Sequence, residues 1–333
     1  MALVGRTREG ILILSCGEDA HVAPVTQHLD EMGVSYRRID PGASPEDSFV
    51  DIEASGGRYQ ARLSGRRPPR IDFERVTCVW YRRPTDMTPA HGEADTRRFT
   101  ASNRRALLYG WLQQLRCEWL PAAPLVEDRA ANKTYQLSFA KEIGFRIPHT
   151  RITASPEALV DMYSRYPQGI IVKPLVPFFN SEQKALQMFT SLVSRRELRA
   201  YRAVRHAPMI VQERIPKRFD IRVTVVGEEV FAAAIDSQAQ SRTAVDFRHD
   251  IVHLRHRVHR LPPAEARRCV GLVKRLGLRF GAIDMILTPA GHYVFLEVNP
   301  NGQWLWIEEH TGLPIANAVA RCLAGCSASR AKP

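Results

Sequence analysis

Short apolar runs alternate with a helical pattern at the start of the chain. Residues 11–15 are apolar enough for a buried strand, and residues 35–39 predict a second strand. Residues 23–32 place apolar side chains at helical spacing before Gly33. Strand, helix and strand in this order predict a parallel βαβ unit. The chain therefore begins with an α/β layer.

The pattern up to residue 122 adds further elements. It predicts strands at 49–54, 58–64 and 77–81, a helix at 94–116 and a linker around Trp119. The first two of these strands are joined by Ser55-Gly56-Gly57, which is typical of a hairpin turn. We place the end of the first domain at residue 122.

From about residue 126 the pattern changes. It predicts helices at 133–143, 264–276 and 315–323, an N-cap at Ser155, strands at 148–152, 170–173 and 209–214, and a hairpin of 221–226 with 230–235. The polar stretch 237–243 predicts a mobile loop, and 327–333 predicts a disordered tail. We expect one subdomain over 123–208 and another over 209–326.

Two apolar strands near the C-terminus carry oxygen-bearing side chains. One ends in Asp284, and the other carries Glu297 and Asn299 on the same face, because side chains alternate along a strand. Hard oxygen ligands of this kind suit Mg²⁺, which binds through a few carboxylates and the phosphates of a substrate. The three side chains predict a phosphate-linked magnesium site.

Basic side chains stand where anions are favoured. Lys133 opens a helix and Lys173 ends a buried strand, so both could reach a phosphate, although each alone would more often be a surface lysine. Asp220 and Arg222 share a strand face and could serve ribose and phosphate, or simply pair with each other. Arg248 could hold a transferring phosphoryl group, or belong to an exposed turn.

Composition narrows the partners. The net charge of +12 favours anionic partners such as a nucleotide, an acidic peptide or nucleic acid. A nucleic-acid-binding protein remains a remote alternative, because the arginines are dispersed and no nucleic-acid motif appears. No apolar run approaches the length of a membrane span and no signal peptide is evident, so we expect no membrane partner and a cytoplasmic location, which also suits six scattered, reduced cysteines.

The ordered set of these residues resembles the ATP-grasp superfamily. It comprises Lys133, Lys173, Gln212-Glu213-Arg214-Ile215, Asp220-x-Arg222, Asp284 and Glu297-x-Asn299. Four runs, 79–84, 132–133, 219–227 and 297–308, are similar more specifically to the ATP-grasp ribosomal peptide maturases, the graspetide synthetases related to microviridin ligases. This resemblance extends from about residue 10 to 324.

The resemblance implies a fold and a role for each matched position. The fold is an α/β (α+β) ATP-grasp fold with a Rossmann-like pre-ATP-grasp domain over 1–122, a central subdomain over 123–208 and a C-terminal subdomain with the Mg/ATP site over 209–326. Lys133 and Lys173 match phosphate-contacting lysines, Gln212, Glu213, Arg214 and Ile215 match the adenine hinge, and Asp220 matches the ribose-binding acid. Asp284, Glu297 and Asn299 match ligands of Mg²⁺, with two ions expected, and Arg222 and Arg248 match arginines near the γ-phosphate and the substrate carboxylate.

The resemblance also implies a reaction. ATP would activate Asp or Glu side chains of a precursor peptide, with a leader and an acidic core, as acyl phosphates, and Ser, Thr or Lys side chains would then close ester or amide rings. The alternative is a ligase that adds a free amino acid or amine to a peptide or small carboxylate. A homodimer is one candidate assembly.

One stretch departs from the superfamily pattern. Many ATP-grasp enzymes have a glycine-rich loop after the second lysine, whereas residues 174–192 contain no glycine. We expect residues 177–181 to form a stiffer lid, and no phosphate-loop residue is assigned.

Overall fold

The computed structural model describes residues 10–43, 49–55, 58–64, 75–85, 87–89, 91–176 and 189–329. The predicted lid at 177–181 and the hairpin turn at 56–57 lie outside these residues. No helix in the described ranges combines the length and the apolar character that crossing a bilayer requires.

A parallel four-stranded sheet forms the N-terminal layer. Its order is β2 (Tyr36–Ile39), β1 (Gly10–Ser15), β5 (Val76–Arg83) and β6 (Glu118–Leu120). Side chains alternate between its faces, so that Ile11 and Ile13 pack on one side and Leu12 and Leu14 on the other. The predicted βαβ start is confirmed, with α1 (Val22–Glu31) between β1 and β2.

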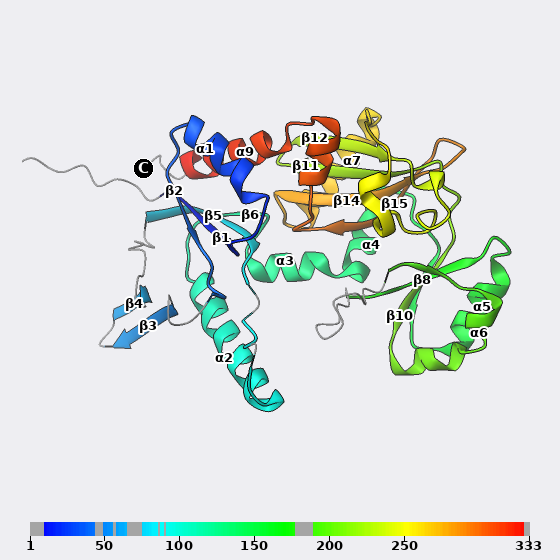
Figure 1. The fold of residues 1–333 in the computed structure, drawn as a ribbon, viewed down its shortest axis with the longest axis horizontal. Helices are drawn as coiled ribbons and strands as arrows, with labels where there is room; N and C mark the ends of the chain where they lie inside the picture. The colour runs from blue at the N-terminus through cyan, green and yellow to red at the C-terminus, as the bar shows by residue number, and fades with distance from the viewer. Residues whose placement is uncertain are drawn as a thin grey trace, which may run out of the picture.

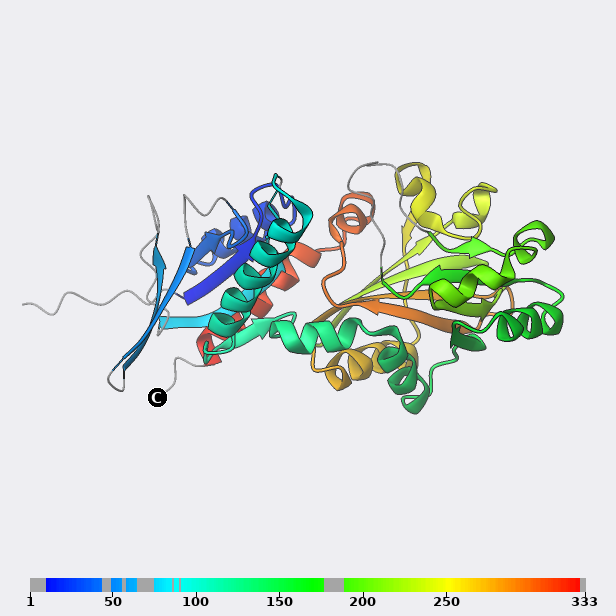
Figure 2. The same cartoon turned by 90° about the horizontal axis from the view of Figure 1, so that it is seen from below.

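Elements from both ends of the chain cover this sheet. Helix α1 and the last helix, α9 (Ile315–Ser329), lie side by side on one face, while α2 (Ala94–Leu112) packs on the other (Figures 1 and 2). The chain thus returns at its end to complete the layer that it began. A separate hairpin of β3 (Phe49–Ser55) and β4 (Arg58–Ser64) confirms the predicted pair of strands.

Two further sheets follow. The smaller has the order β7 (Thr150–Thr153), β10 (Met209–Glu213), β8 (Ile170–Pro174) and β9 (Ser191–Leu192), and it carries α5 (Pro156–Arg165), α6 (Arg195–Leu198) and η2 (Tyr201–His206). The larger has the order β13 (His256–Val258), β12 (Glu229–Ile235), β11 (Phe219–Val226), β14 (Phe280–Leu287) and β15 (Tyr293–Asn299), and all its pairings are antiparallel.

Three helices share a hydrophobic core with the larger sheet. The apolar sides of α3 (Pro124–Ala131), α4 (Lys133–Glu142) and α7 (Pro263–Arg275) meet inward-facing residues of β11, β14 and β15. Helix α3 also runs between the N-terminal layer and this sheet, as Figure 1 shows. The remaining elements are η3 (Ser237–Ala239), η4 (Phe247–His253) and α8 (Leu305–Thr311).

Several sequence-based expectations are wrong. The expected mobile loop at 237–243 is anchored, because the hydroxyl of the buried Thr243 donates to the carbonyl of the buried Ser237 (2.7 Å). The tail is not disordered from residue 327, since α9 continues to Ser329. Strand β6 occupies the expected linker, and α2 ends four residues earlier than predicted, at Leu112.

Candidate active site

A cavity of about 370 Å³ lies between the smaller and the larger sheet. Strands β8 and β10 form one side of it, and β11, β14 and β15 form the other. Predicted site residues that line it are Lys173, Gln212, Glu213, Arg214, Ile215, Asp220, Arg248, Asp284 and Glu297. The remaining three, Lys133, Arg222 and Asn299, are bonded to members of that set. Residues more than 160 positions apart in the chain are thus gathered at one site.

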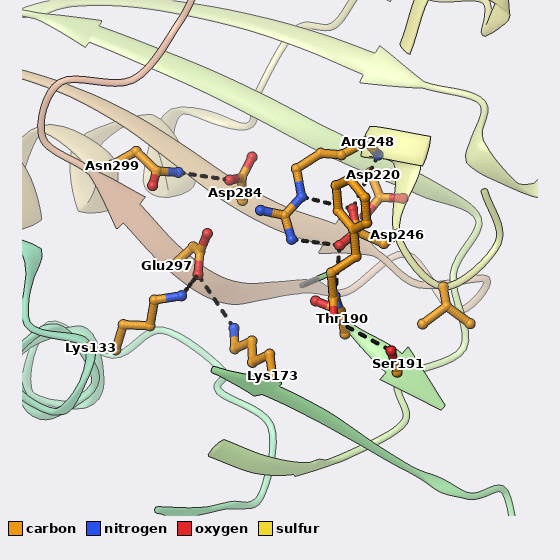
Figure 3. Close-up of polar contacts among 12 residues, drawn as sticks. Lys133, Lys173, Thr190, Ser191, Asp220, Asp246, Arg248, Asp284, Glu297 and Asn299 are labelled. Carbon is orange, nitrogen blue, oxygen red and sulfur yellow. Dashed lines mark hydrogen bonds and ion pairs between the residues drawn. The ribbon is translucent and has the colours of Figure 1, made fainter. Parts of the chain in front are cut away.

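The oxygen-bearing side chains meet where β14 and β15 pair. Asp284 lies opposite Glu297 in the register, next to an irregularity between Asp284 and Met285. Asn299 Nδ2 donates to Asp284 Oδ2 at 3.1 Å (Figure 3). Asn299 therefore meets Asp284 through its amide nitrogen, and Glu297 lies opposite Asp284 on the adjacent strand.

Both lysines point at one oxygen of Glu297, as Figure 3 shows. The Nζ atoms of Lys133 and Lys173 lie 2.8 Å and 3.5 Å from Glu297 Oε2. Burial would raise the pKa of Glu297, but Lys173 and Lys133 outweigh it and hold that pKa well below its usual range. Burial lowers the pKa of Lys173 more than Glu297 raises it. The carboxylate and the two ammonium groups form one charged cluster.

Local structure presents Lys133 to the site. Asn132 caps α4, because its side-chain oxygen accepts from the backbone N–H groups of Thr134 (3.0 Å) and Tyr135 (3.2 Å). Lys133 is the first residue of that helix, where the helix dipole favours anions. The position suits a contact to phosphate.

Asp220 and Arg222 do not pair with each other, so the ion-pair alternative for these two residues is wrong. Arg222 Nη1 donates to both oxygens of Asp284 at 2.8 Å, and Nη2 donates to the carbonyl of Gln303 at 2.9 Å. Asp220 accepts from Lys217 at 3.0 and 3.2 Å and from the hydroxyl of Ser237 at 2.5 Å. Burial raises the pKa of Asp220 despite these partners.

Arg248 is anchored rather than free on an exposed turn. Its Nε and Nη2 donate to the two oxygens of Asp246 (2.8 and 2.5 Å), and its guanidinium lies 5.7 Å from the ring centre of Phe189. Asp246 also accepts from the backbone N–H of Thr190 at 3.1 Å. Burial would raise the pKa of Asp246, but the bonds from Arg248 lower it. The guanidinium is held facing the cavity while about 41% of the side chain is exposed.

The hinge side chains turn partly toward the smaller sheet. Gln212 Nε2 donates to Thr150 Oγ1 at 2.9 Å, and Glu213 Oε1 accepts from the backbone N–H of His149 at 2.7 Å. Arg214 and Ile215 continue along the cavity wall. The side chains of Gln212 and Glu213 are thus engaged by residues at β7.

Sequence reasoning missed several partners of the site. Lys217, Ser237, Asp246 and Thr190 hold Asp220 or Arg248 in place, yet none was singled out for a role. Lys217 precedes Asp220 by three residues and could have been noticed. Asp246 precedes Arg248 by two residues and could have been noticed in the same way. Ser237 and Thr190 depend on contacts between distant elements, for which the sequence holds no local signal.

The donor set fits magnesium. Asp284, Glu297 and Asn299 carry hard oxygen atoms, the donor type that Mg²⁺ binds together with phosphate and water oxygens. Among the described residues, no group of three or more His, Cys, Asp or Glu side chains is placed to hold a metal ion by itself. The two lysines beside Glu297 would favour the same phosphates.

Comparison with known proteins identifies both halves of the chain. Residues 10–127 match the family model of the MvdD pre-ATP grasp domain, and residues 130–323 match that of the RimK-like ATP-grasp domain. A probable alpha-L-glutamate ligase of Chromohalobacter salexigens is 26% identical over 198 residues, which are 57% of this chain and 62% of that protein. The chain therefore spans about three fifths of the length of this curated relative.

Solved structures match over nearly the whole chain. Macrocyclase MdnC from Microcystis aeruginosa MRC, bound with precursor peptide MdnA, is 29% identical with a TM-score of 0.83, and the match covers 95% of this chain and 99% of MdnC. A Chryseobacterium gregarium RiPP-associated ATP-grasp ligase, in complex with ADP and a leader and core peptide, is 27% identical with a TM-score of 0.85, covering 95% and 97%. The predicted ATP-grasp fold with its N-terminal domain is confirmed, and the chain belongs to the RimK-like ATP-grasp family.

Proposed function

We propose that this protein is an ATP-dependent ligase that closes rings within a ribosomal precursor peptide. The observation that carries the proposal is the extent of the similarity to two peptide-bound ligases, which covers 95% of the chain and includes the N-terminal layer. The match to the glutamate ligase covers only 57% of the chain. The N-terminal layer thus favours a peptide substrate.

The cavity supports ATP as the first substrate. The hinge 212–215 would contact adenine, and the buried Asp220 would accept from ribose hydroxyls. Lys133 and Lys173 would move from Glu297 to the phosphates, which carry more negative charge than one carboxylate. Asp284, Glu297 and Asn299 would hold Mg²⁺, two ions in our proposal, and the metal would neutralise charge that gathers on the phosphates.

The arginines would act on the peptide carboxylate. In the first step an oxygen of an Asp or Glu side chain attacks the γ-phosphorus, ADP leaves, and an acyl phosphate forms. In the second, a hydroxyl or amine of the same peptide attacks the acyl carbon, phosphate leaves, and a proton is lost to solvent. Arg248 would orient the carboxylate and stabilise the transferring charge, because Asp246 fixes its guanidinium in direction.

The alternative is addition of a free amino acid or amine, and the curated relative named as a glutamate ligase favours it. Mass distinguishes the two reactions. The protein is incubated with ATP, Mg²⁺ and candidate precursor peptides rich in Thr, Asp and Glu, with free glutamate present or absent. Loss of one water per ring from an otherwise unchanged peptide supports ring closure, whereas a gain in mass that requires glutamate would overturn it.

The proposal also covers the charge of the chain, its division into units and its location. An acidic core peptide suits the net charge of +12, and the division at residues 122 and 208 into pre-ATP-grasp, central and C-terminal units is proposed as the functional one. We also propose a cytoplasmic location, where ATP and a newly made peptide are both present.

A further inference from the structure

A short segment after β15 joins the N-terminal layer to the Arg222–Asp284 end of the site. Residues 300–306 follow the candidate metal ligand Asn299, and Asn301 within it contacts the N-terminal layer. Arg82 Nη1, at the end of β5, donates to the carbonyl (2.8 Å) and side-chain oxygen (2.6 Å) of Asn301. Asn301 Nδ2 donates in return to the backbone carbonyl of Tyr81 at 2.9 Å. This segment, which we call the strut, is therefore tied to the N-terminal sheet.

A buried network fixes Arg82 from its other side. Arg82 is 2% exposed, and its Nε lies 3.3 Å from Asp19 Oδ2. Asp19 also accepts from the hydroxyl of Ser15 (2.9 Å) and contacts His21 Nδ1 (2.9 Å). Burial would raise the pKa of Asp19, but His21 and Arg82 outweigh it, so Asp19 is ionised opposite Arg82.

The same network reaches the strut a second time. The backbone N–H of Trp304 donates to His21 Nε2 at 3.3 Å, and the two rings meet edge to face with centroids 5.1 Å apart. Because His21 Nε2 accepts this bond, its Nδ1 is protonated and donates a hydrogen bond to Asp19 Oδ1. Two residues of the N-terminal layer therefore hold the strut at two points, Asn301 and Trp304.

The opposite side of the strut contacts Arg222, which in turn binds the candidate metal ligand Asp284. The carbonyl of Gln303 accepts from Arg222, whose other nitrogen grips Asp284. The backbone at Gly302 is packed tightly against Ala282 and Arg222, because a Cβ placed on Gly302 would lie 2.4 Å from Ala282 Cβ and 2.9 Å from Arg222 Nη2. Farther along, the ring of Trp306 lies 6.1 Å from that of Phe247, the neighbour of Arg248.

We propose that Arg82 is a positioning residue, which through Asn301 and the strut sets the placement of Arg222 and Asp284. Arg82 does not line the cavity, so it acts only through these partners. The N-terminal layer then contributes to the metal end of the site as well as to any peptide surface. This role rests on the proposed function, since it assigns Asp284 to the metal.

The test separates positioning from simple stabilisation. Arg82→Lys keeps the positive charge, but its single nitrogen cannot replace both Nε, which faces Asp19, and Nη1, which binds Asn301. We measure ADP affinity without metal by calorimetry, Mn²⁺ affinity of the ADP complex by electron paramagnetic resonance, and kcat and KM with peptide. The control is Leu108→Ala, which creates a cavity on the far face of the N-terminal sheet and touches no part of the strut.

The expected result is a split between these quantities. Arg82→Lys should leave metal-free ADP affinity unchanged, weaken Mn²⁺ binding about 10–100-fold, as supporting contacts to metal ligands typically do, and lower kcat more than it changes KM. Leu108→Ala should lower the melting temperature without changing Mn²⁺ affinity. Unchanged Mn²⁺ affinity and kcat in a destabilised Arg82→Lys would overturn the proposal.

Two further outcomes are decisive. If Arg82→Lys does not fold, Asn301→Ser is the second variant. It removes the side-chain bonds of Asn301 to Arg82 and to the carbonyl of Tyr81, while the bond from Arg82 to the backbone carbonyl of residue 301 stays, and the same split is expected of it. A wild-type protein that binds Mn²⁺ and ADP but modifies no peptide refutes the peptide substrate alone, and the positioning role is still tested by metal affinity. A wild-type protein that binds no Mn²⁺ with ADP refutes both.

Discussion

Glu297 is the carboxylate that both candidate phosphate-binding lysines contact. It is 9% exposed, and its Oε2 lies 2.8 Å from Lys133 Nζ and 3.5 Å from Lys173 Nζ. In the proposed ATP complex, Lys133 and Lys173 would turn to the phosphates and Glu297 would bind Mg²⁺ instead. The same carboxylate would therefore pair with lysines in the ligand-free site and with the metal in the loaded one.

Glu297→Gln should lower kcat by at least about 100-fold, because an amide is a weaker metal ligand than a carboxylate and carries no charge. The protein should stay folded by circular dichroism but melt at a lower temperature, since the buried Lys173 loses its counter-charge. Adding Lys173→Met should restore the melting temperature and not the activity. Turnover that survives Glu297→Gln would contradict the assignment.

Glu127 should make stability depend on pH. Its Oε2 is buried, and burial raises its pKa to about 8. The folded protein therefore favours the protonated acid, and wild type loses stability as pH rises from the unfolded value of about 4.5 through 8. Glu127→Gln has no such loss, so its advantage in free energy of unfolding should grow over that range by about 1.4 kcal/mol per pH unit, to about 4–5 kcal/mol.

Urea denaturation at pH 5, 7 and 9 measures this difference. The exposed Glu309→Gln is the matched control. Curves for Glu127→Gln and wild type that stay parallel across the three pH values would show that Glu127 is ionised in the folded protein.

Residue types could be predicted from the sequence, but their partners could not. Lys133 and Lys173 were singled out at a helix start and a strand end, and Asp284 and Glu297 on two C-terminal strands, and the structure gathers them. The expectation that the first of these strands ends in Asp284 is wrong, because β14 continues to Leu287. The pairing of Arg222 with Asp284 instead of Asp220 depends on the register of β11 against β14, which places Arg222 opposite Asp284. Register between strands about 60 residues apart is a tertiary property.

At the scale of elements, local signals predicted those helices that carry their own start and stop. Ser155 with Pro156 marked the start of α5, and its hydroxyl does accept from the N–H of Ala158. Helix α3 was missed because its eight residues have little periodicity and pack against β15 and α4. Strand β6 has only three residues and exists through its pairing with β5.

The cap of α4 should matter for ATP as well as for folding. Asn132→Ala removes two bonds to the first turn and should lower the free energy of unfolding by about 1 kcal/mol. Because Lys133 is the next residue, KM for ATP should rise while kcat changes less. Asn132→Asp, which can still cap, should restore most of the stability. An unchanged KM in the alanine variant would separate the cap from nucleotide binding.

At the scale of the molecule, the boundaries in sequence and in space differ. Helices α3 and α4 fall in the range expected for the central subdomain but pack against the larger sheet. Helix α9 falls almost entirely in the range expected for the C-terminal subdomain but covers the N-terminal sheet. Sequence order alone could not show this return of the chain. The last helix thus makes the N-terminal layer depend on the C-terminal end.

That dependence predicts how fragments behave. Residues 10–127 alone should fail to fold cooperatively, because the face of the sheet that bears Ile11, Ile13 and Trp80 would lose the apolar side of α9, including Val319 and Leu323. The same fragment joined to residues 313–329 by a flexible linker should regain a cooperative thermal transition, since the helix again covers that face. Replacing Val319 with Asp in the linked fragment should abolish the gain. Circular dichroism melting of the three fragments decides the matter, and a cooperative transition in residues 10–127 alone would show that α9 is dispensable to the N-terminal layer.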